Sequence, residues 1–180
     1  MTWIPWLSAL APLAYAAASL APDRPLSIRK SSLTAAWLSM AGALAVLVAV
    51  LGWGGAARAG AIALGGLPHP DPLGAILSGL IAFIGLIVVA YSQNYLAGDP
   101  RQGRFIRQLC LTLGLLHALV LSSHLAQLVV CWIAASLCVN RLLLFRGERQ
   151  AAVLAARKRF LVSRLADAAL IVAAALLWRA

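Results

Sequence analysis

Two residues of opposite charge lie three positions apart in the last apolar stretch of this 180-residue chain, and they are the strongest candidates for chemistry. Arg164 and Asp167 fall within residues 160–178, and a spacing of three places both side chains on one face of a helix. Ionisable side chains are costly in hydrocarbon, so those inside spanning segments usually face a protein interior or a wet cavity, and they often belong to an ion path. The pair therefore predicts either a structural ion pair between helices or a step in ion conduction.

Three more polar side chains interrupt apolar sequence. His117 and His124 are seven residues apart, so we expect them on one helix face. A neutral imidazole titrates near physiological pH and can relay protons, although a buried histidine can equally serve as a hydrogen-bonding group alone. Arg141 is expected near a helix end, where it either joins the ion path or extends to the membrane surface.

Membrane-spanning helices must position these residues. The chain is 63% hydrophobic with a mean hydropathy of +0.91, which is more apolar surface than a soluble domain of this size can bury. Its apolar residues form six blocks, each close to the ~20 residues that a helix needs to cross a bilayer, at 3–21, 33–53, 73–94, 105–123, 125–145 and 160–178. The sequence predicts an all-α fold: a single polytopic transmembrane domain over residues 1–180, built as a bundle of six helices.

The positions of the basic residues predict the orientation of this bundle. The net charge is +10, and Lys and Arg gather after blocks one, three and five, whereas the connections after blocks two and four carry only Arg58. By the positive-inside rule the N-terminus is outside and the first, third and fifth connections are cytoplasmic. No aromatic-interleaved basic face accompanies the charge, so the predicted partner is the lipid bilayer and not nucleic acid.

Several local signals predict where the helices begin and end. The segment Met1–Ser8 lacks the positive charges of a signal peptide, so the first block is expected to be a retained helix. Ser31 and Ser32 are expected to cap the second helix, and Asp99 to cap or pair within the third connection. Residues 150–158 contain neither Gly nor Pro and are rich in Ala and Leu, which predicts one helix of ~45 Å from about Glu148 to Trp178.

The chain offers no expected metal or catalytic chemistry of its own. Cys110, Cys131 and Cys138 all lie in apolar blocks without Cys-x-x-Cys spacing, so apolar packing is their predicted role. No Cys/His cluster has the spacing of zinc ligands. The sequence therefore predicts that the chain is not an enzyme and that it has no catalytic residue, metal or cofactor.

Three segments together resemble the antiporter-like subunits of respiratory complex I and Mrp antiporters. Residues 89–105 resemble the exit of the third helix in those subunits, where Tyr-Ser-x-x-Tyr precedes an Asp and an Arg-Phe pair. Residues 131–137 occupy the position of a Trp-Glu motif in the fifth helix, with Ile133 in place of the glutamate. Residues 156–160 with Arg164 and Asp167 resemble the Lys-x-Phe, Arg-x-x-Asp start of the sixth helix. The resemblance implies an ion path, and the candidates for it are Asp167, Arg164, His117, Lys158, Arg141 and His124.

Four stretches, at residues 98–105, 134–137, 141–145 and 156–165, are most similar to the DabB family of membrane subunits. That resemblance implies a subunit of the bacterial cell inner membrane that couples a proton or sodium gradient to uptake of inorganic carbon, as CO2 or bicarbonate. It implies a DabA-like partner that resembles a zinc β-carbonic anhydrase and carries the zinc and the catalysis. Family members are longer, so the resemblance is to their N-terminal part. The candidates for docking this partner are Arg101, Arg104, Arg107, Arg146, Arg149, Arg157 and Arg159.

Two alternatives remain open on the sequence. The chain could be a fragment of an NADH-quinone oxidoreductase or Mrp-type antiporter subunit, against which Ile133 argues, or a structural scaffold that docks a soluble partner. Whether the protein purifies with redox subunits decides whether it is a fragment of an oxidoreductase subunit. If Asp167 proves dispensable, the scaffold is favoured.

The predicted orientation is open to a direct test with an impermeant thiol reagent. Single cysteines at Ser27, Gly103 and Gln150 are expected to be shielded in intact cells, because the basic connections hold them inside, whereas a cysteine at Gly60 is expected to react. Labelling at residue 150 from outside contradicts the six-span arrangement.

Overall fold

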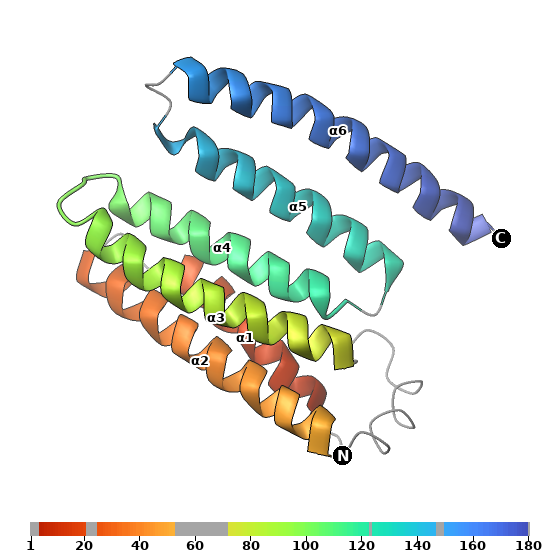
Figure 1. Cartoon of the computed structure of the whole chain (residues 1–180), viewed down its shortest axis with the longest axis horizontal. Helices are drawn as coiled ribbons and strands as arrows, with labels where there is room; N and C mark the ends of the chain where they lie inside the picture. The colour runs from red at the N-terminus through yellow and green to blue at the C-terminus, as the bar shows by residue number, and fades with distance from the viewer. Residues whose placement is uncertain (1–3, 21–24, 53–71, 123, 147–149, 180) are drawn as a thin grey trace.

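The chain folds as a set of long helices laid side by side (Figure 1). The computed structural model describes residues 4–20, 25–52, 72–122, 124–146 and 150–179. Within these ranges the elements are α1 (Ile4–Ser19), α2 (Pro25–Gly52), α3 (Pro72–Tyr95), α4 (Gln102–Val120), α5 (Leu125–Leu143), the short 3-10 turn η1 (Leu144–Arg146) and α6 (Gln150–Arg179). The described residues form helices joined by turns and contain no strand, which confirms the predicted all-α fold class.

Four helices are long and apolar enough to cross a membrane by length and composition, over Ile28–Leu51, Pro72–Tyr95, Leu125–Leu143 and Ala156–Arg179. The other two, α1 and α4, pack against each other, and α4 also contacts α2, α3 and α5. Protein therefore covers much of α4, and a helix shielded by protein needs less apolar surface than one that faces lipid. The predicted multi-pass membrane protein is confirmed.

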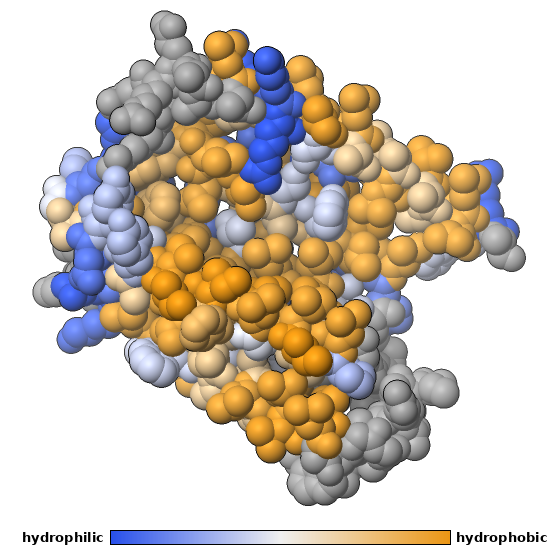
Figure 2. Space-filling view, in the orientation of Figure 1, coloured by the Kyte–Doolittle hydropathy of each residue, from blue (hydrophilic) through white to orange (hydrophobic). Residues whose placement is uncertain are grey.

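Successive helices run in opposite directions, so one end of the molecule collects the basic residues. At that end, on the left of Figure 1, α1, α3 and α5 finish and α2, α4 and α6 begin. We call it the basic end, because it carries Arg29, Lys30, Arg101, Arg104, Arg107, Arg157, Lys158 and Arg159. Figure 2 shows apolar side chains over the middle of one face and polar side chains gathered mainly toward this end. An apolar middle with polar residues at the end is the distribution expected of a helix bundle in a bilayer.

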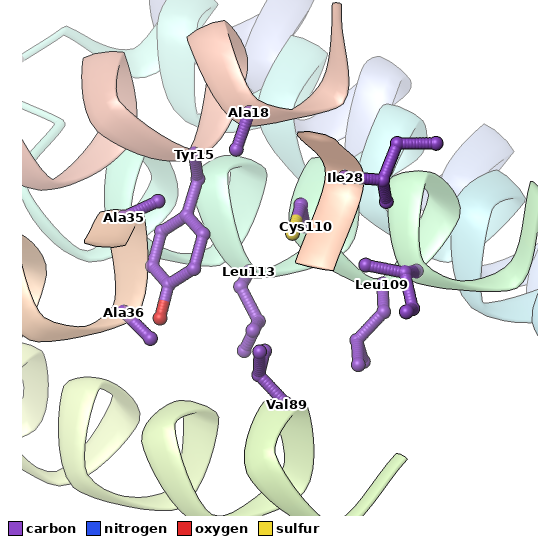
Figure 3. Close-up of a cluster of buried hydrophobic side chains, with 10 residues drawn as sticks. Tyr15, Ala18, Ile28, Ala35, Ala36, Val89, Leu109, Cys110 and Leu113 are labelled. Carbon is purple, nitrogen blue, oxygen red and sulfur yellow. The ribbon is translucent and has the colours of Figure 1, made fainter. Parts of the chain in front are cut away.

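A buried tyrosine stands at the centre of the packing between α1, α2, α3 and α4 (Figure 3). Tyr15 is fully buried in a cluster that includes Ala36, Val89 and Leu113. Its hydroxyl lies 3.1 Å from the Oγ of Ser39, so the polar group is satisfied inside the apolar core. Among the described residues, this is the larger of two buried apolar clusters.

The helix boundaries confirm some local predictions and correct others. Ser31 and Ser32 do not cap α2, because the helix already begins at Pro25, and proline suits the first helical position. Both serine hydroxyls instead donate hydrogen bonds to carbonyls one turn earlier in the helix. Ser32 Oγ also accepts a 2.8 Å bond from Gln93 Nε2, which ties α3 to α2. Asp99 does not cap α4, because the N-cap residue is Arg101 and makes no side-chain capping bond. The Asp99 Oδ1 instead accepts a 2.7 Å bond from the Arg101 N–H within the turn before the helix.

The structure confirms the long terminal helix and corrects the expectation for the two histidines. One helix runs from Gln150 to Arg179, which confirms the long terminal helix; Glu148 lies outside the described residues, as do residues 53–71 of the second connection. His117 and His124 do not share a helix face, because α4 ends at Val120 and His124 precedes the first residue of α5.

Two glycines of α3 provide a matched test of the α1–α4 packing. A Cβ atom at Gly85 lies 2.9 Å from the Tyr15 hydroxyl and 3.2 Å from the Leu113 methyl groups, whereas a Cβ at Gly79 meets nothing within 4 Å. We expect Gly85→Ala to lower the free energy of unfolding in detergent micelles by about 1–3 kcal/mol through overpacking. Gly79→Ala is the control and should leave it unchanged or slightly raised. Equal unfolding curves for the two variants contradict this packing.

Candidate functional site

Helix α6 touches the rest of the molecule along one stripe of its surface. From residue 156 onward every described side chain of α6 is exposed except those at helical spacing on this stripe, which are Ala156, Phe160, Ser163, Arg164, Asp167, Leu170 and Ala174. In Figure 1 this helix lies beside α5 at the edge of the molecule. The two charged residues of the stripe therefore lie at the contact between α5 and α6, as expected for costly groups in a spanning helix.

The charged residues form a compact cluster with two hydroxyl groups. Arg164 Nη2 lies 2.6 Å from Asp167 Oδ2 and donates a 3.3 Å hydrogen bond to Ser136 Oγ of α5. Ser136 Oγ and Ser163 Oγ are hydrogen-bonded at 2.5 Å. The guanidinium also lies over the Phe160 ring, 5.2 Å from its centroid, a favourable position for a cation.

The two partners of the ion pair differ in burial. The Asp167 side chain is 5% exposed and that of Arg164 is 31% exposed. Both carboxylate oxygens of Asp167 are buried and accept no hydrogen bond from the described residues, so their electrostatic partner is Arg164 alone. A buried carboxylate with unused lone pairs can accept a proton or a cation.

The cluster lies at the middle of the candidate span. That span runs from Ala156 to Arg179, so Asp167 is 11 residues from its start and 12 residues from its end. At 1.5 Å per residue the carboxylate is about 12 Å from the level of Arg159 and about 18 Å from the other end. Aspartate is too short to reach the membrane surface from that depth, so its charge must be paired or neutralised there.

The second buried polar group, His117, belongs to a different part of the structure. Its ring is fully buried, its Nδ1 donates to the Leu113 carbonyl at 2.9 Å, and its ring centroid lies 5.7 Å from that of Tyr15. The Ser78 backbone of α3 also faces the ring. The structure thus places His117 inside the α1–α4 bundle, whereas Asp167 lies at the contact between α5 and α6.

The other ion-path candidates are not brought to the Arg164–Asp167 pair. Arg141 is exposed in the last turn of α5, and His124 is exposed before the first turn of α5. Lys158 is exposed nine residues before Asp167 on α6 and lines a groove between α4, α5 and α6. Within the described residues, the pair and its hydroxyl neighbours are thus the part of the predicted path that forms one cluster.

Sequence reasoning singled out the charges of this cluster but not its hydroxyl groups. Ser136 and Ser163 come from two helices and are 27 residues apart. Their spacing carries no signal, because their contact depends on which faces of α5 and α6 meet. Ser163 lies next to Arg164 on the stripe of α6 that carries the charged pair, and this position could have indicated it, whereas Ser136 on α5 carried no such signal.

The docking candidates also have defined places. Arg101, Arg104 and Arg107 line a hollow of about 550 Å³ at the basic end, together with Asp99. Arg157 and Arg159 are exposed near the start of α6. Arg149 and the side chain of Arg146 lie outside the described residues.

Known proteins resemble part of this chain. Residues 69–106 match the family described as the N-terminus of chain 5 of NADH-ubiquinone oxidoreductase (complex I). The chain is 42% identical over 104 residues to the probable inorganic carbon transporter subunit DabB of Hydrogenovibrio crunogenus. The matched region covers 57% of this chain and 20% of that protein. It is 37% identical over 102 residues to the probable inorganic carbon transporter subunit DabB2 of Halothiobacillus neapolitanus, covering 57% and 18%.

A relative with a different printed function is also similar. The chain is 33% identical over 97 residues to the F(420)H(2) dehydrogenase subunit L of Methanosarcina mazei, covering 54% of this chain and 14% of that protein. The matched region spans about a fifth or less of the length of these relatives. The chain is therefore similar to the N-terminal part of DabB subunits and of the antiporter-like subunits of complex I, as its motifs predicted.

Proposed function

We propose that this chain is the N-terminal part of a membrane subunit that conducts protons or sodium ions and couples their gradient to uptake of inorganic carbon. The observation that carries the proposal is the buried Asp167 carboxylate at the middle of a span, paired with Arg164 and free of hydrogen bonds from the described residues. Similarity to two probable inorganic carbon transporter subunits supports inorganic carbon as the transported species.

The cluster has the parts that a reversible cation site needs. Arg164 stays protonated in proteins, so it neutralises an ionised Asp167. When a proton or sodium ion occupies the carboxylate, the guanidinium keeps two other contacts, the Ser136 hydroxyl and the Phe160 ring. The ion pair can therefore open without leaving Arg164 unpartnered, which lowers the cost of each binding event.

The chemistry of carbon hydration is assigned to a partner. Among the described residues no three His, Cys, Asp or Glu side chains come together as a metal site would require. We propose that a DabA-like subunit holds the zinc, as in a β-carbonic anhydrase, and interconverts CO2 and bicarbonate, while this chain conducts the ions whose gradient drives uptake. The arginines of the basic end, including Arg101 and Arg157, would attract an acidic partner surface there.

A second candidate function is membrane-arm ion transport driven by a redox reaction. The similarity to an F(420)H(2) dehydrogenase subunit favours it. Ile133, a side chain that cannot carry a proton, stands in the fifth helix where the resembling respiratory subunits have a glutamate. Co-purification of the full-length protein with redox subunits would support this second candidate over the first.

The proposed coupling is tested by removing the charge of Asp167 while keeping its shape. The full-length protein and its DabA-like partner should restore growth in ordinary air to a host lacking carbonic anhydrase. Asp167→Asn should lower carbon uptake at least tenfold with the complex still assembled, because the amide cannot bind a proton or cation as the carboxylate does.

The control is Asp99→Asn, the same chemical change in the turn between α3 and α4. It should leave uptake near the wild-type value. Full uptake in Asp167→Asn returns the pair to a structural role and favours the scaffold alternative, and uptake that is indifferent to an uncoupler contradicts gradient coupling.

A further inference from the structure

A groove opens between α4, α5 and α6 on the side of α6 next to the charged cluster. It has a volume of about 580 Å³, within the usual range for ligand pockets. Leu116 and Leu119 of α4 and Trp132 and Val139 of α5 contribute apolar walls. The groove thus offers hydrocarbon surface to a long apolar ligand.

The remaining wall of the groove is amphipathic along α6. Lys158, Arg159, Val162 and Ala166 line it, and their spacing places them on one face of the helix. The two cations come first, two and three residues after the start of the span at Ala156. The groove is therefore positively charged near the basic end, at the depth of lipid headgroups, and apolar further into the membrane.

We propose that this groove binds an anionic phospholipid of the leaflet at the basic end. The phosphate lies on Lys158 and Arg159, and an acyl chain lies along Val139 and Val162 toward Leu119. The charge complementarity selects this occupant, because basic pockets between spanning helices on the cytoplasmic side suit anionic headgroups. An apolar helix would fill the hydrocarbon part but would leave both cations without a counter-charge.

The bound lipid would also border the charged cluster. Ser136 and Ser163 line the groove, and Ser136 accepts the hydrogen bond from Arg164. An acyl chain at this position covers the hydrogen bond between Arg164 and Ser136 and separates it from the surrounding bilayer. The proposal does not depend on the coupled function, since lipid binding is measured without ion flux.

The experiment titrates the purified full-length protein in detergent with phosphatidylglycerol or phosphatidylcholine and counts bound lipids by native mass spectrometry. The wild type should bind phosphatidylglycerol at least fivefold more tightly than phosphatidylcholine. The double variant Lys158→Gln/Arg159→Gln should lose at least fivefold in phosphatidylglycerol affinity. The matched control, Lys30→Gln/Arg157→Gln, removes two exposed charges from the same end and should bind as the wild type does.

A variant in the apolar part of the groove distinguishes binding inside the groove from non-specific attraction of lipid to the positive surface. Val162 is exposed and lines the groove, so Val162→Trp should fill it without harming the fold and should weaken binding of both lipids. Equal affinity for the two lipids overturns the proposal and favours a neutral occupant such as an apolar helix. Equal losses in the two double variants, or unchanged binding in Val162→Trp, also overturn it.

Discussion

The attraction between one carboxylate and one guanidinium in hydrocarbon is the constraint on which the outer half of this molecule depends. Asp167 lies at the middle of its span and is almost fully buried, so its charge requires a partner within reach. Arg164 provides it from the same helix, and Ser136 holds Arg164 from α5. The stripe of α6 that carries the pair therefore has to face α5, because the remaining α6 surface over residues 161–178 is apolar and suited to lipid. The Arg164–Asp167 ion pair therefore determines both the orientation of α6 and the position of the candidate ion site.

The two halves of the described chain have different physical characters. The α1–α4 bundle is closely packed around Tyr15, and Gly85 and Gly114 let the helices approach that residue. By contrast, α6 contacts its neighbours mainly through α5, and its contact contains charges and hydroxyls. Polar contacts between helices can change partners at a smaller cost than a tightly packed apolar core can rearrange. A rigid bundle beside a polar, exchangeable contact is a suitable design for a site that binds and releases ions.

Most of the fold could be predicted from the sequence, because hydropathy reports directly which segments can cross a bilayer. The six apolar blocks correspond to the six helices, but hydropathy missed the start of α2 by eight residues, since the turns around Arg29 and Lys30 are helical although polar. The pairing of Arg164 with Asp167 was predictable from local spacing. The contact with Ser136 was not, because the rotation of α5 against α6 depends on packing of the whole surface. The shared face expected for His117 and His124 was wrong because α4 ends between them.

The central claim is that Asp167 lies on an ion path, and flux across a sealed membrane tests it most directly. The complex of the full-length protein with its partner is reconstituted into liposomes, a membrane potential is imposed, and entry of protons is followed with a trapped pH dye and entry of sodium with a radioactive tracer. One of the two fluxes should exceed that of empty liposomes and fall at least tenfold in Asp167→Asn while Asp99→Asn retains it. Equal flux in the wild type and Asp167→Asn would contradict the account.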